Sequence, residues 1–191
     1  MSIPIQNQEN QLTPYHSNYG WLVMALLWAI EIPAGMMFFS LGVLLPVWQD
    51  TLGVTPLQAG LLGAAGFLGF GMTALPAGIW LTKYNPKLVI LTSVVGMAAM
   101  AFVQSIAHTT TILLVSRIAL VMFIAIRLQV QVIFVQQWFT SRIYSTVNGF
   151  DFGSRSLAHL LGLAATPPLI VLLGDLRSFM SMLVISLLSL S

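Results

Sequence analysis

The stretch ILLVSRIALVMFIAIRLQVQVIFVQQWF, residues 112–139, is almost wholly apolar, yet it contains Arg117 and Arg127. A helix needs about 20 apolar residues to cross a hydrocarbon core about 30 Å thick, so this stretch is long enough to span a membrane. An arginine at the bilayer centre costs at least about 2.5–3.5 kcal/mol unless it faces protein or a wet cavity. At about 100° per residue, Arg117, Arg127 and Gln131 fall within a sector of about 80°. The stretch therefore predicts a membrane helix with one polar stripe that faces the interior of a helix bundle.

The composition of the chain is that of an integral membrane protein. Hydrophobic residues make up 58% of its 191 residues and charged residues only 6%, whereas about 25% of a typical soluble domain is charged. The absence of cysteine excludes a disulfide framework, a cysteine-ligated metal and a thiol nucleophile. The net charge of +2 is too small and too dispersed to indicate nucleic-acid binding. No cofactor is expected, because the glycines lie in an apolar segment and do not form a phosphate-binding loop after a strand.

Six apolar segments separated by short polar turns predict an all-α membrane protein, a bundle of about six transmembrane helices. The predicted spans cover about residues 21–48, 57–81, 88–107, 112–139, 146–173 and 179–191. The last segment is shorter than the ~20 residues that a crossing needs, so we expect five complete spans and a truncated sixth. The chain is therefore interpreted as a fragment or a truncated product, with a shallow interfacial end as the alternative. Many small residues in the second segment favour close approach of neighbouring helices.

The first 20 residues are polar and contain no lysine or arginine. A signal peptide needs a basic start, an apolar run and a small-residue cleavage site, and this pattern is absent. The sequence therefore predicts two parts: a polar cytoplasmic tail at 1–20 and a six-span bundle at 21–191.

The orientation of the spans follows from the lysines and arginines in their connections. Lys83 and Lys87 follow the second span and Arg142 follows the fourth, whereas Arg177 stands alone on the other side. Cytoplasmic loops carry the excess of such residues, so we expect the N-terminus to lie in the cytoplasm. We accordingly expect a multi-pass protein of the plasma membrane.

Glu31 is an acidic residue deep in the first predicted span. Inside a membrane, such residues usually pair or line a pathway. Two hypotheses are open for Glu31: it is a proton-coupling acid, or it is the ion-pair partner of Arg117 or Arg127. Pro33 follows two residues later and favours a kink, because it lacks the N–H that a helix interior needs.

The fifth predicted span places Asp151, Arg155 and His159 within about 80° of one another. Asp151 and Arg155 have the i,i+4 spacing of an intrahelical ion pair. This pair is either structural, near the cytoplasmic end of the helix, or part of the wall of a substrate or proton path. In the second case His159 is a candidate proton carrier, since imidazole titrates near neutral pH; a hydrogen-bonded structural role is the alternative.

A local pattern lies at the end of the second span and in the loop that follows it. Gly78, Lys83 and Lys87 match positions of the pattern Gly-x-Leu-Ala-Asp-Arg-x-Gly-Arg-Lys, in which Thr82 stands where the aspartate belongs. In their order and spacing the spans and this pattern resemble the N-terminal half of a major facilitator superfamily transporter, over about residues 20–191. The resemblance implies that Gly78, Lys83 and Lys87 belong to the gating loop, although the missing aspartate moves part of that gate to other residues.

The resemblance extends to two further motifs. Arg117, followed by Trp-Phe at 138–139, is similar to the span-4 motif of the family, which implies a role for Arg117 in proton transfer or anion contact. Gly162 and Pro167 match part of the span-5 motif of the family's antiporters, which leaves symport and antiport both open. Since a complete family member has about twelve spans in two pseudo-symmetric halves, the expected partners are the lipid bilayer, a small-molecule solute, a coupling proton, and either the missing C-terminal half or a second copy.

These features favour secondary active transport by alternating access, and the excess of intramembrane arginines favours an anionic or carboxylate-bearing solute. The candidate residues of the substrate or proton pathway are Glu31, Arg117, Arg127, Gln131, Asp151, Arg155 and His159. The alternative is a remnant half-transporter that acts only as a non-transporting or dimerising membrane protein. An intramembrane enzyme is not expected, because Ser154, Ser156 and His159 share one helix and a His-Glu-x-x-His motif is absent.

Overall fold

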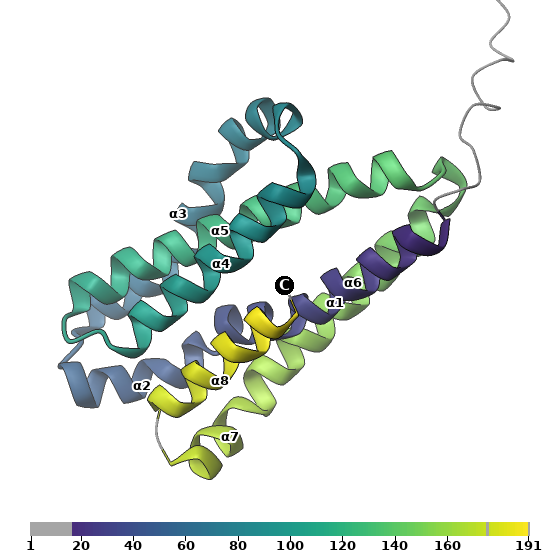
Figure 1. The fold of residues 1–191 in the computed structure, drawn as a ribbon. Helices are drawn as coiled ribbons and strands as arrows, with labels where there is room; N and C mark the ends of the chain where they lie inside the picture. The colour runs from purple at the N-terminus through teal and green to yellow at the C-terminus, as the bar shows by residue number, and fades with distance from the viewer. Residues whose placement is uncertain (1–16, 175, 191) are drawn as a thin grey trace, which may run out of the picture.

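The computed structural model of the chain describes residues 17–174 and 176–190, without the side chains of residues 17, 18, 74, 75, 77–80, 82 and 176. All regular structure in this part is helical (Figure 1). The elements are α1 (Ser17–Phe39), α2 (Leu41–Leu52), α3 (Pro56–Trp80), the short 3-10 helix η3 (Leu81–Lys83), α4 (Pro86–Ser105), α5 (Thr110–Trp138), the 3-10 helix η4 (Ser141–Ile143), α6 (Tyr144–Ala164), α7 (Thr166–Leu173) and α8 (Leu176–Ser189).

The helices have the length and hydropathy of membrane spans. Within the described residues, three helices are long and apolar enough to cross a bilayer: Tyr19–Phe39, Pro86–Ser105 and Thr110–Trp138. A fourth span is formed if α6 and α7, which are bent by 52° relative to each other, are taken together. The predicted all-α membrane fold is confirmed, and the sixth predicted segment corresponds to α8, a helix of 14 residues. The division into a tail at 1–20 and a bundle at 21–191 stays a prediction: residues 1–16 lie outside the described residues, and α1 begins at Ser17.

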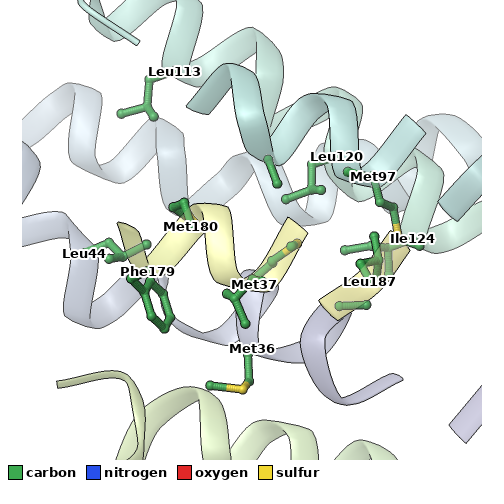
Figure 2. Close-up of a cluster of buried hydrophobic side chains, with 14 of the residues drawn as sticks. Met36, Met37, Leu44, Met97, Leu113, Leu120, Ile124, Phe179, Met180 and Leu187 are labelled. Carbon is green, nitrogen blue, oxygen red and sulfur yellow. The ribbon is translucent and has the colours of Figure 1, made fainter. Parts of the chain in front are cut away.

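The long helices form two groups joined by α8. In one group α5 packs against α3 and α4, and in the other α1 packs against α6 (Figure 1). The helix α8 contacts both α4 and α1. Figure 2 shows the resulting core, in which Phe179, Met180 and Leu187 of α8 lie among apolar side chains of the neighbouring helices. The labelled neighbours are Met36, Met37, Leu44, Met97, Leu113, Leu120 and Ile124.

The first predicted span is two helices rather than one. The helix α1 continues across Pro33, and the interruption lies at Ser40, between α1 and α2. There the N–H groups of Val43 and Leu44 both bond the carbonyl of Ser40, at 2.9 Å each. A helix breaks where another group inserts into its backbone ladder. Two side chains do so here: the hydroxyl of Ser40 donates to the carbonyl of Met37 at 3.4 Å, and Arg117, described below, bonds the same carbonyl.

The fifth predicted span is also divided, between α6 and α7 at Ala165. The sequence supplies the reason: Pro167 and Pro168 stand in the first turn of α7, where a missing N–H is tolerated, but they cannot donate back to the carbonyls at the end of α6. At this break the hydroxyl of Thr166 donates to the carbonyl of Gly162 at 2.7 Å, which gives that carbonyl a partner.

Two glycines allow helices to approach closely. A Cβ added at Gly35 of α1 would lie 2.5 Å from the Cβ of Ala158 in α6. A Cβ at Gly69 of α3 would lie 2.8 Å from the Cβ of Val121 in α5. The role expected for the small residues of the second span therefore applies to Gly69, whereas a Cβ at Gly60 would meet no atom within 4 Å.

Candidate solute pathway

A buried ion pair joins the first and fourth predicted spans. A guanidinium nitrogen (Nη2) of Arg127 in α5 donates a hydrogen bond to the Oε2 atom of Glu31 in α1. The two side chains are 0% and 8% exposed. Of the two arginines considered for Glu31, Arg127 is thus the one that contacts it.

The hydrogen bonds continue from this pair into α6. The Nη1 atom of Arg127 donates to Oε1 of Gln131 at 3.0 Å, and Nε2 of Gln131 donates to Oδ1 of Asp151. The Nη2 atom of Arg155 donates to Oδ2 of Asp151 at 2.5 Å, which forms the predicted i,i+4 pair. We call Glu31, Arg127, Gln131, Asp151 and Arg155 the polar network. It connects α1, α5 and α6, and its two carboxylates balance its two guanidinium groups.

Arg117 lies apart from the polar network although it shares the helix α5 with Arg127. Its residue is 1% exposed, and its Nη1 and Nη2 atoms donate to the carbonyls of Met37 at 2.7 Å and Phe38 at 2.5 Å. Its guanidinium carbon lies 5.4 Å from the centre of the Phe38 ring. These carbonyls are at the C-terminal end of α1, where the helix dipole favours a cation. Arg117 therefore holds the break between α1 and α2, and the predicted polar stripe is divided into two sites.

A cavity of about 350 Å³ opens beside Arg117. Aromatic rings from α1 and α3 form most of its wall, and two glycines of α3 leave room between them. The lining residues are Phe38, Phe39, Leu41, Gly63, Gly66, Phe67, Phe70 and Arg117. These phenylalanines belong to none of the motifs in the sequence; the adjacent pair Phe38–Phe39, next to the interrupted span, is the signal that could have indicated them.

His159 is not part of the polar network. Its ring stacks on the ring of Phe39, with centroids 4.0 Å apart and an angle of 15° between the planes. Among the described residues, the hydrogen bonds of Asp151 and Arg155 do not include His159. Asp151, Arg155 and His159 therefore lie on one helix as predicted, but only Asp151 and Arg155 are bonded to each other.

The three predicted gating residues lie in three different elements. Lys83 is exposed on η3. Lys87 lies in the first turn of α4, where the side chain of Asn85 accepts a hydrogen bond from its backbone N–H at 3.1 Å. The Nζ atom of Lys87 donates to the hydroxyl of Tyr19 in α1 at 3.1 Å, so this loop is tied to the start of the first span. Gly78 lies in the part of α3 whose side chains are not described.

The described residues contain no group of three or more His, Asp or Glu side chains placed to hold a metal ion. What they contain is a set of membrane-length helices, a buried polar network and a buried cation beside a cavity. Buried ionisable side chains between membrane helices are typical of proteins that pass polar solutes or ions across a bilayer. Fold and site thus define a multi-pass membrane protein of the transporter type.

Comparison with known proteins agrees with this class. The family model described as Major Facilitator Superfamily matches residues 27–191. The chain belongs to this family, so the resemblance noted from the sequence motifs is confirmed and a transporter role follows. Comparison with curated proteins finds no match.

Proposed function

We propose that the protein is a secondary active transporter of the plasma membrane that moves a small carboxylate-bearing solute by alternating access, with its N-terminus in the cytoplasm. The observation that carries the proposal is the uncompensated charge of Arg117 at the wall of a cavity. The family match favours this function over the alternative of a non-transporting membrane protein.

The buried ionisable groups differ in whether they have a partner of opposite charge. Within the described residues, Glu31 pairs with Arg127 and Asp151 pairs with Arg155. Among the described residues, Arg117 has only backbone carbonyls and the face of Phe38 as partners, so no described carboxylate neutralises its positive charge. Its Nε atom is buried without a hydrogen-bond partner. A solute carboxylate would supply both the negative charge and the missing acceptor, because arginine recognises carboxylates through adjacent N–H donors.

The cavity beside Arg117 supports a solute with an apolar body. Its volume of about 350 Å³ lies within the usual range of small-molecule sites. Phe38, which lies against the guanidinium, and Phe39, Phe67 and Phe70 give the cavity an apolar wall. An aromatic or branched aliphatic carboxylate fits this combination of one cation and several rings.

The divided spans support alternating access. Transporters of this kind bind solutes near interrupted helices and move two units against each other around that site. Here α1 and α2 are interrupted at Ser40, where Arg117 bonds the freed carbonyls, and α6 and α7 meet at an angle of 52°. The polar network lies on the same α1 and α6 helices, so a proton taken up by Glu31 would weaken the link between α1 and α5. We propose Glu31 as the coupling acid on this basis, with His159 beside Phe39 as a second candidate for the proton path.

A groove of about 480 Å³ on α1 and α6 supports the need for a second unit. Gly149, Gly153 and Ser154 leave its floor open, and the rim includes Phe150, which is 57% exposed. Small residues on an exposed apolar face allow a further membrane helix to pack closely. We propose that a C-terminal half or a second copy covers this groove. Because the chain has no cysteine, a Gly153→Cys variant carries a single thiol. A disulfide-linked dimer formed on oxidation would indicate that a second copy covers the groove, whereas a variant that stays monomeric would contradict a second copy there.

Transport assays with purified protein in liposomes test the proposed function. We expect labelled benzoate to accumulate under an imposed proton gradient, and labelled benzamide, a neutral analogue of the same shape, to be excluded. Arg117→Gln should abolish benzoate uptake, whereas Arg142→Gln, which removes an exposed charge in η4, should not. Equal uptake of benzoate and benzamide, or full activity of Arg117→Gln, would contradict the proposal.

A further inference from the structure

A polar cavity, separate from the polar network and from the cavity beside Arg117, lies where the end of α2, the end of α4 and the start of α8 meet. It has a volume of about 380 Å³, and its polar lining consists of Trp48, Thr51, Gln104, Ser105, His108 and Arg177. We propose that this cavity binds a phosphate group, carried either by a lipid head group or by a free phosphate ion. The proposal does not depend on the transported solute.

Gln104 is the residue that marks the cavity as a site. It is 2% exposed, and both its amide nitrogen and its amide oxygen are buried without a hydrogen-bond partner. Buried side-chain amides in native proteins nearly always have partners, so two unpartnered atoms on one side chain call for a ligand. The amide nitrogen can donate to a phosphate oxygen, and the amide oxygen can accept from a hydroxyl on or next to the phosphate.

The charges around Gln104 favour an anion. Arg177 lines the cavity and is exposed, so its guanidinium is free to approach a phosphate, which it can bind through two parallel N–H bonds. His108 lines the same cavity from the connection that follows α4. No carboxylate of the described residues lines it, so Arg177 brings a positive charge to the cavity without a counter-charge among the described lining residues.

The hydroxyl groups of the lining favour a ligand that also has hydroxyls. Thr51 Oγ1 donates to the carbonyl of Val47, and Ser105 Oγ donates to the carbonyl of Phe102, at 2.7 Å each. Each hydroxyl has thereby used its proton and can offer only lone pairs to a ligand. The glycerol of phosphatidylglycerol, or a protonated phosphate, supplies both a phosphate and hydroxyl donors.

The cavity also has the surroundings of a membrane interface. It lies at the end of α4, a helix long and apolar enough to span the bilayer, and Trp48 on its wall is a residue type typical of the interface. Val47, Leu52 and Ala107 complete the wall with apolar surface. A ligand with a polar head and an apolar stem matches this arrangement.

Native mass spectrometry of the delipidated protein tests the proposal with three probes: phosphatidylglycerol, diacylglycerol without a phosphate, and inorganic phosphate. We expect phosphatidylglycerol to bind and diacylglycerol not to bind. Arg177→Gln and Gln104→Leu should each weaken phosphatidylglycerol binding by about tenfold or more, the loss expected for one charge-assisted or buried hydrogen bond. Arg142→Gln removes the same charge outside the cavity and should bind as the wild type does.

The outcomes separate the two sources of phosphate. Binding of phosphatidylglycerol, with inorganic phosphate bound only weakly, identifies a lipid head-group site; binding of inorganic phosphate that depends equally on Arg177 and Gln104 identifies a site for free phosphate. Equal retention of diacylglycerol and phosphatidylglycerol, undiminished binding by both variants, or no binding of either phosphate probe would overturn the proposal. Because Gln104→Leu removes buried polar atoms that have no partner, its melting temperature without ligand should not fall below that of the wild type, which shows that any lost binding is not lost folding.

Discussion

The carboxylate of Glu31 in α1 accepts a hydrogen bond from the guanidinium of Arg127, 96 residues further along the chain, and both groups are almost completely buried. Each charge would be costly alone in a membrane interior, and each removes much of the cost of the other. The same arginine bonds Gln131, which bonds Asp151 in α6. The pair thus fixes how α1, α5 and α6 meet.

Replacing Glu31 by Gln should therefore destabilise the fold strongly. The variant leaves the guanidinium of Arg127 buried without a counter-charge, and breaking a buried pair in this way costs about 3–5 kcal/mol. Chemical unfolding of the purified variant in detergent measures the loss. The double variant Glu31→Gln with Arg127→Gln removes both charges and should recover most of the stability; a double variant no more stable than the single one would contradict the assignment of the pair.

Replacing Asp151 by Asn should cost much less. Its partner Arg155 has a side chain that is 38% exposed, and exposed ion pairs contribute about 0–1 kcal/mol. The Asn side chain also keeps an oxygen that can accept from Gln131. Chemical unfolding of Asp151→Asn and of Glu31→Gln under the same conditions compares the two losses of stability. An equal loss in both variants would show that the Asp151–Arg155 pair contributes as much to stability as the Glu31–Arg127 pair.

The close approach of α1 and α6 predicts that Gly35→Ala is destabilising. The added methyl would lie 2.5 Å from the Cβ of Ala158, so the helices must separate, at a cost of about 1–3 kcal/mol. Gly60→Ala makes the same change where the methyl meets no atom within 4 Å, and it should be neutral or stabilising by up to about 1 kcal/mol. Ala158→Gly in the Gly35→Ala background should restore stability; an unchanged deficit would refute the proposed contact.

The hold of Arg117 on the break at Ser40 predicts a local effect on backbone opening. In Arg117→Leu the carbonyls of Met37 and Phe38 lose their bonds to the guanidinium. Hydrogen–deuterium exchange of the segment 36–44 should become faster, because local opening is easier where backbone groups lose partners. Exchange in α4 should stay unchanged, and Arg142→Leu should affect neither segment. If the segment 36–44 of Arg117→Leu exchanged at the wild-type rate, the break would not depend on this side chain.

The proposed coupling role of Glu31 predicts a change in energetics as well as in stability. Glu31→Gln cannot release or bind a proton at this position. In the double variant Glu31→Gln with Arg127→Gln, which should recover most of the stability, solute uptake should lose its dependence on the proton gradient while exchange of solute down its own gradient persists. Uptake in liposomes with and without a gradient measures both. A variant that still accumulates solute under the gradient would leave Glu31 as a structural partner of Arg127 only.

Much of the fold could be predicted because hydropathy is a local property of the chain. The apolar segments, the turns between them and the cap at Asn85 follow from residues adjacent in sequence. The interruption before Pro167 could also be predicted, since a proline removes a hydrogen bond from its own turn of a helix. The interruption at Ser40 could not be predicted, because a serine alone does not require a helix to break and the guanidinium that bonds the carbonyls before it comes from α5.

The sequence by itself determined that the protein lies in a membrane and that the arginines within its spans must face protein. It also determined that Asp151 and Arg155 can pair along one helix. Each of these follows from composition or helical periodicity. Only the tertiary structure decided which charges meet. It separated Arg117 from Arg127, joined Arg127 to Glu31 and Gln131 to Asp151, and placed His159 on Phe39. The reason is physical: periodicity fixes the direction of a side chain around its own helix, but the packing of helices decides what stands opposite it.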